Sequence, residues 1–197
     1  MIIPFLLISI LTRCNQSSVE QDIHVYFDLD SLVKGQANIL KTKKVILNKK
    51  VVINDKTEIR EISTDSLEWL EELELFSLAN INKPVNQGMY EVIDRKDVES
   101  NLIVRDYTHK VQEEAAVPYM RLWYLQDVSN IRKIQLKFVQ DNIVYHSERV
   151  LTMELTDIES PGVLQYYSIL GYQKLTGMDT TNYIVEGTTI FSSTRKK

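Results

Sequence analysis

Three consecutive residues, His146, Ser147 and Glu148, are of the types that a serine hydrolase uses. A serine nucleophile needs a histidine within hydrogen-bonding distance and a carboxylate that orients this histidine. The surrounding sequence predicts a β-strand, in which neighbouring side chains point to opposite faces of the sheet. We therefore expect that His146 and Ser147 do not meet. The chain also contains no Gly-x-Ser-x-Gly sequence that would present a serine on a sharp turn.

The other titratable residues show no spacing typical of a catalytic or metal site. The histidines are His24, His109 and His146, and none pairs with a second histidine or a cysteine at metal-binding spacing. Asp28 and Asp30, like Glu113 and Glu114, are carboxylates close in sequence, but a helix cap and a solvated loop explain them more simply than acid–base catalysis does. We expect no enzyme activity, no metal and no cofactor.

The single cysteine, Cys14, follows an apolar segment, residues 2–11, with only Thr12 and Arg13 between them. A helix needs about 20 apolar residues to cross a bilayer, so this segment is too short to span one, whereas it has the length of the apolar part of a signal peptide. Polar residues begin directly after the cysteine. The alternative is a buried N-terminal strand with an ordinary cysteine, which is less favoured because the apolar residues do not alternate with polar ones.

The sequence Leu11-Thr12-Arg13-Cys14 resembles the Leu-x-x-Cys box of bacterial lipoprotein precursors, which are cleaved before the cysteine and diacylated on its thiol. The resemblance implies a signal peptide over residues 1–14, a polar tether over 15–22 and a membrane anchor at Cys14. Arg13 stands where such boxes have a small residue, and no Lys or Arg precedes the apolar segment. Each buried methylene of an acyl chain contributes about 0.8 kcal/mol, so several chains together hold a protein firmly on a membrane.

The rest of the chain has the composition of one globular domain. The full sequence has 197 residues, of which 44% are hydrophobic and 25% are charged. A chain of this length and composition can bury a core without disulfides. The net charge of −4 gives no bulk attraction for nucleic-acid phosphates. We expect a single domain over residues 23–192, a basic tail over 193–197 and no nucleic-acid partner.

Helical periodicity occurs in residues 28–41 and again in residues 66–80. Asp28 or Asp30 is placed to cap the first helix. The second begins with a capping-box arrangement over residues 65–68, in which Asp replaces the usual Ser or Thr. Both segments carry one apolar stripe, so we expect both helices to pack on the sheet.

The remaining segments alternate between apolar and polar residues, which is typical of strands. The predicted strands are 43–53, 57–62, one that begins at 102, 118–125, 131–139, 143–155, 164–175 and 182–191. In residues 143–155 the apolar side chains, from Ile143 onward, occupy odd positions. Short connections without intervening helices require antiparallel pairing of the later strands.

These elements predict an α+β fold, a twisted antiparallel sheet of about eight strands with two helices on one face. The order of helix and sheet behind a lipoprotein leader is similar to the half-barrel of lipoprotein-localisation factors. The Trp-x-x-Glu-Leu-x-x-Phe sequence of residues 69–76, the Ile-Asn-Lys-Pro of 81–84 and the Tyr-x-Ile-x-Gly-x-Gln-Lys of 167–174 resemble small lipoproteins of Bacteroidota. These motifs are structural and imply no activity.

Aromatic residues are concentrated in the predicted strands. They pack well across a sheet, which explains their presence without any ligand. The functional hypothesis is an open concave face that accepts an apolar ligand. The candidate residues for this face are Tyr119, Trp123, Tyr145, Tyr167 and Tyr172.

Two functions remain after these exclusions. The first is a lipid-anchored lipoprotein of the bacterial cell envelope, at the outer membrane and facing the periplasm or the cell surface, that acts as a binding or structural accessory module. Its partners would be the membrane, through acylated Cys14, and an envelope protein or hydrophobic ligand. The second is a carrier of a lipid or another hydrophobic ligand on the concave face of the sheet.

Overall fold

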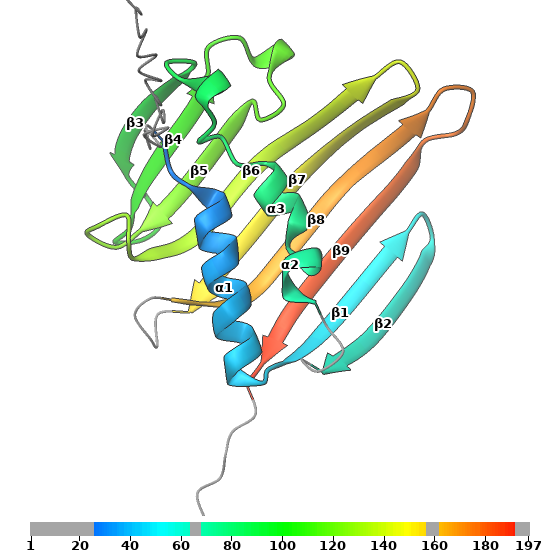
Figure 1. The fold of residues 1–197 in the computed structure, drawn as a ribbon, viewed down its shortest axis with the longest axis horizontal. Helices are drawn as coiled ribbons and strands as arrows, with labels where there is room; N and C mark the ends of the chain where they lie inside the picture. The colour runs from blue at the N-terminus through cyan, green and yellow to red at the C-terminus, as the bar shows by residue number, and fades with distance from the viewer. Residues whose placement is uncertain (1–25, 64–67, 157–161, 192–197) are drawn as a thin grey trace, which may run out of the picture.

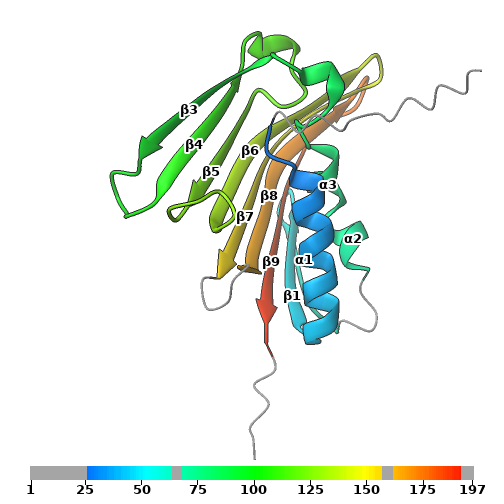
Figure 2. The same cartoon turned by 60° about the vertical axis from the view of Figure 1, so that its left-hand side comes forward.

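The computed structural model describes residues 26–63, 68–156 and 162–191. These residues form an open antiparallel sheet of nine strands that curves around helices on one face (Figures 1 and 2). The predicted α+β class with a half-barrel-like sheet is therefore confirmed, with one strand more than expected. The predicted signal peptide (1–14), polar tether (15–22) and basic tail (193–197) lie outside the described residues.

The sheet has the strand order β2-β1-β9-β8-β7-β6-β5-β4-β3, and every neighbouring pair is antiparallel. The strands are β1 (Ile46–Ile53), β2 (Lys56–Ser63), β3 (Tyr90–Lys96), β4 (Ile103–His109), β5 (Tyr119–Tyr124), β6 (Ile131–Asn142), β7 (Tyr145–Thr156), β8 (Val163–Leu175) and β9 (Thr181–Ile190). The helices are α1 (Leu29–Lys43), α2 (Trp69–Glu72) and α3 (Glu74–Leu78), with 3-10 turns η1 (Pro84–Asn86) and η2 (Gln112–Glu114). The early hairpin joins the sheet through the pairing of β1 with β9, the last strand.

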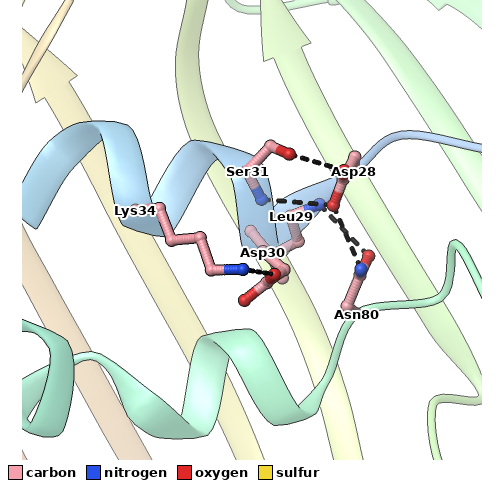
Figure 3. A network of polar contacts seen from close by, with 6 residues as sticks. All are labelled: Asp28, Leu29, Asp30, Ser31, Lys34 and Asn80. Carbon is pink, nitrogen blue, oxygen red and sulfur yellow. Dashed lines mark hydrogen bonds and ion pairs between the residues drawn. The ribbon is translucent and has the colours of Figure 1, made fainter.

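Helix α1 begins at a cap that also ties it to another part of the chain. The side chain of Asp28 accepts hydrogen bonds from the backbone N–H and the hydroxyl of Ser31, at 3.2 and 2.6 Å. Asn80, just after α3, donates to the same carboxylate at 3.1 Å and accepts from the N–H of Leu29 at 3.2 Å (Figure 3). Of the two predicted caps, Asp28 is therefore the one used, while Asp30 pairs with Lys34 at 2.6 Å.

Helix α1 packs on the sheet through its predicted apolar stripe, and Val33, Ala37 and Leu40 are buried. Burying one such aliphatic side chain of Val or Leu size contributes about 1.5–3 kcal/mol. Gln36 is buried in the same stripe, and its amide donates to Gly162 O and accepts from Leu164 N, both at 2.8 Å. It thereby satisfies backbone groups near the point where the register between β7 and β8 shifts.

The second predicted helix is not continuous. It is interrupted at Leu73, whose φ of −101° and ψ of 8° leave the helical region, so that α2 and α3 are separate short helices. Trp69, Leu73 and Phe76 are nevertheless buried at helical spacing, whereas Leu70 of the predicted stripe is exposed. Because the buried spacing continues across the interruption, periodicity alone could not show it. The predicted cap at Asp65 lies outside the described residues.

Two details of the strands also differ from expectation. Strand β3 was not predicted, because it is an edge strand in which only Tyr90 is buried. Apolar residues do not alternate with polar ones along it. The hairpin between β6 and β7 was expected to turn at residues 141–142, but β6 continues through Asn142. Ile143 therefore lies in the turn, with 96% of its surface exposed, rather than in β7.

We call the helix-covered face of the sheet the inner face and the opposite one the outer face. Strand register assigns side chains to them, because alternate residues of a strand share a face. The inner face holds most of the fully buried apolar residues of the strands, including Leu47, Met120, Leu122, Ile134, Leu136, Leu151, Met153 and Tyr167. The β6–β7 and β8–β9 hairpins reach beyond the helices, so their inner face has no helix over it (Figures 1 and 2).

Candidate functional site

The structure does not bring the five predicted aromatic residues to one face. Tyr145 and Tyr167 lie on the inner face, where Tyr167 is fully buried beside Met153 of β7. The remaining three, Tyr119, Trp123 and Tyr172, lie on the outer face. Parity within a strand indicates this separation: Tyr167 and Tyr172 are an odd number of residues apart in β8 and must face opposite ways. Ligand binding by these residues stays a prediction.

A buried arginine, which the sequence analysis did not single out, organises the inner face near the hairpins. Arg149 of β7 is 7% exposed. Its guanidinium donates from Nε to the Tyr183 hydroxyl, from Nη1 to Gln140 Oε1 and from Nη2 to the Tyr145 hydroxyl. We call these four side chains the Arg149 cluster. It joins β6, β7 and β9, and Tyr145 is its only predicted candidate.

Gly171 makes room for the arginine on the strand between β7 and β9. It lies opposite Arg149 in the β7–β8 pair, and a Cβ at this position would lie 2.3 Å from the backbone oxygen of Glu148, 3.0 Å from Arg149 Cα and 3.1 Å from its Cγ. The absence of a side chain lets the stem of Arg149 cross β8 and reach Tyr183. A glycine within a strand marks this kind of close approach, and this is the signal that could have identified the cluster from sequence.

Ser147 lies two residues before Arg149 on the inner face. Its hydroxyl is fully buried and has no hydrogen-bond partner among the described residues. His146 and Glu148 point to the outer face, so the expectation that His146 and Ser147 do not meet is confirmed. The three residue types of a hydrolase triad are present in sequence but divided between the faces of the sheet.

A second buried polar cluster lies where α2 covers the inner face. The carboxylate of Glu72 accepts hydrogen bonds from the Tyr167 hydroxyl and from Lys49 Nζ, the latter at 2.8 Å. Burial and the adjacent Glu72 carboxylate raise the pKa of Tyr167. Gly187 lies beneath the Tyr167 ring, as Gly171 lies beneath Arg149. The charges of Lys49 and Glu72 are paired, so this cluster fastens α2 to the sheet.

On the outer face, a groove of about 340 Å³ runs between the η2 segment and strands β6 and β7. His146 lies in it, 3.3 Å from Asp141 and 3.6 Å from Glu148, and 3.3 Å from the Tyr172 hydroxyl. A hydrogen bond from Lys137 is the main cause that lowers the pKa of Glu148. In this groove the charges of Lys137 and Glu148 are therefore paired, and His146 lies beside two carboxylates.

No group of three or more His, Cys, Asp or Glu residues in the described part of the chain is placed to hold a metal ion. The helices of that part include none long and apolar enough to cross a membrane. No family model, curated protein or solved structure matches the chain.

Proposed function

We propose that the protein is a lipid-anchored binding module of the bacterial cell envelope that catalyses no reaction. The observation that carries the proposal is the sequence before and at Cys14, an apolar segment of signal-peptide length that leads into a Leu-x-x-Cys box. Acyl chains on Cys14 would hold the folded domain at a membrane surface.

The folded domain supports a role in binding. Its sheet has an inner face without a helix over it at the hairpins and a groove on the outer face. Among the described residues, the hydroxyl of Ser147 has no hydrogen-bond partner, and the residues that line the groove include no serine or cysteine that could act as a nucleophile. His146 contacts only carboxylates and a tyrosine hydroxyl among the described residues. The partner would be an envelope protein or an amphipathic small molecule.

Labelling with radioactive palmitate in the host tests the anchor. We expect the wild-type chain to incorporate the label and Cys14→Ala to incorporate none, since the thiol is the attachment point. Mature protein that is soluble in the periplasm and carries an unmodified thiol would contradict the proposal.

A carrier of a hydrophobic ligand is the second candidate, and the packing of the inner face restricts where its ligand would bind. Leu40, Leu73 and Phe76 of the helical layer are fully buried against the sheet, so the centre of this face is filled. A ligand of the inner face would therefore bind beyond the helices, near the Arg149 cluster. Native mass spectrometry of the purified protein tests this function, because a carrier is expected to retain a co-purifying lipid.

A further inference from the structure

We propose that the Arg149 cluster binds the carboxylate of an amphipathic molecule. This inference rests on the proposed binding function and names the class of its ligand. The observation behind it is a buried positive charge on the uncovered part of the inner face, with no carboxylate of the described residues within ion-pair distance.

Arg149 differs from the Lys and Arg residues of the protein that form ion pairs. Among the described residues it is the one Lys or Arg that is buried, and no described carboxylate lies within ion-pair distance of it. Several less buried cations, in contrast, form ion pairs: Arg105 with Asp94, Arg95 and Arg121 with Asp106, Lys50 with Glu186 and Lys137 with Glu148. Burying a charge without an opposite charge is costly, so proteins usually pair buried charges. An anionic ligand would supply the missing charge.

The hydrogen-bond donors of Arg149 are only partly used. A guanidinium has five N–H groups, and Tyr183, Gln140 and Tyr145 accept from three of them. Both terminal nitrogens thus keep one N–H for a further acceptor, which suits the two oxygens of a carboxylate. Tyr145 lies at the first position of β7, beside the hairpin turn, and is only half-buried. Displacing its hydroxyl would open the guanidinium to the ligand.

The surroundings favour a carboxylate on an apolar chain over a phosphate. One arginine supplies one positive charge, which matches a carboxylate better than a doubly charged phosphate. Inner-face residues next to the cluster are apolar and accessible: Ile53 is 48% exposed and Leu175 is 39% exposed. Val51 and Val185 lie between them and the helices, half-buried. An alkyl chain lying on these residues would cover their exposed surface.

Titration calorimetry of the full chain carrying Cys14→Ala, which has no acyl group of its own to compete, tests the proposal. The probe is laurate, with dodecanol and dodecyl phosphate as ligands of the same chain length. We expect laurate to bind at least about tenfold more tightly than either, as a charge-assisted hydrogen bond to the carboxylate predicts. Equal binding of laurate and dodecanol, or tighter binding of dodecyl phosphate, would overturn the proposal.

Substitutions then locate the binding site. Arg149→Met should weaken laurate binding about tenfold or more, whereas Arg121→Met, which removes the same charge from the outer face, should leave it unchanged. Tyr145→Phe should bind laurate at least as tightly as the parent, because no hydroxyl has to be displaced. Unchanged binding in Arg149→Met, or its loss in Tyr145→Phe, would show that the cluster is structural only.

If Arg149→Met does not fold, the affinities of laurate, dodecanol and dodecyl phosphate for the parent protein and for Tyr145→Phe still show whether the cluster binds a carboxylate. Palmitate labelling of Cys14 in cells does not depend on laurate binding. The anchor and the ligand can therefore fail separately.

Discussion

Two glycines on the inner face each accommodate a long side chain that crosses from the neighbouring strand. Gly171 lies beneath Arg149, and Gly187 lies beneath the Tyr167 ring. Tyr167 is fully buried, and its hydroxyl reaches Glu72 of α2. The residue type at positions 171 and 187 therefore determines whether both polar clusters of the inner face can form.

Gly187→Ala tests this dependence. The added methyl would overlap the Tyr167 ring, so either the ring or the backbone of β9 must move. Forcing extra volume into a packed interior destabilises a protein by about 1–3 kcal/mol. We expect Gly187→Ala to lower the free energy of unfolding by about 3 kcal/mol or more. Urea denaturation measures the loss. Gly35→Ala on the exposed side of α1 meets nothing within 4 Å and should instead stabilise the protein slightly. Equal stability of wild type and Gly187→Ala would contradict the packing of Tyr167.

The ion pair in the outer-face groove predicts a dependence of stability on pH. Lys137 Nζ lies 2.7 Å from Glu148 and is the main cause that lowers the pKa of this carboxyl. A lowered pKa in the folded state stabilises the protein above the ordinary carboxyl pKa of about 4, and this contribution is lost as the pH falls through the folded pKa. Both side chains are about one-third exposed, so the pair contributes less than about 1 kcal/mol.

A double-mutant cycle of Lys137→Met and Glu148→Gln, measured by urea denaturation, isolates this contribution. We expect a coupling energy of about 0.5 kcal/mol at neutral pH, which is lost at an acidic pH below the lowered pKa of Glu148. A coupling energy that persists at the acidic pH would show that the two side chains interact through packing rather than charge.

Sequence reasoning at the level of single residues succeeded where only parity in a strand was needed. It correctly separated His146 from Ser147, because neighbours in β7 face opposite ways. The same parity places Tyr167 and Tyr172 on opposite faces of β8, so the five aromatic candidates do not share one face. Gly171 within a strand is the one sequence signal for the Arg149 cluster, but the partners of Arg149 come from three strands, so only the fold shows which side chains surround it.

At the level of elements, the start of α1 depends on a contact with a distant segment. The Asp28 carboxylate caps the helix through Ser31 and also accepts a hydrogen bond from Asn80. The cap thus joins the start of α1 to the segment that follows α3 (Figure 3). This contact holds α1 and α3 in a fixed position relative to each other.

Asp28→Ala should lower the free energy of unfolding by about 1–2 kcal/mol, because it removes the cap and leaves the Asn80 amide without this acceptor. Asp30→Ala, in the first turn of the same helix, is the matched control. Its pair with Lys34 is exposed, and its loss should cost only about 0.5 kcal/mol or less. Thermal unfolding followed by circular dichroism measures both. Equal effects of the two variants would contradict the assignment of Asp28 as the cap.

Elements whose apolar residues recur at a regular spacing were predictable, and elements without such a spacing were not. Helix α1 and the strands β5 to β9 follow from apolar residues at helical or alternating spacing. The edge strand β3 has one buried residue and offers no such pattern. The end of β6 was misplaced because Ile143 continues the apolar alternation of β7 while lying in the turn.

For the whole molecule, the sheet is open and ends in two charged edges. Strand β2 contains Lys56, Glu58, Arg60 and Glu61, and β3 contains Glu91, Asp94, Arg95 and Lys96. Charged side chains on edge strands discourage pairing with the edge of another sheet. Partner binding is therefore better served by the faces of the sheet than by its edges. The α+β class was predictable from the order of elements, whereas the pairing of β1 with β9 was not, because it joins segments far apart in sequence.

The central claim, that a lipid on Cys14 holds this domain at a membrane, is tested most directly by the intact mass of the protein extracted from membranes of its host. The account predicts a chain that begins at Cys14 and is heavier than its amino acids by the attached acyl groups. A chain that retains residues 1–13, or one that begins elsewhere with an unmodified Cys14, would contradict it.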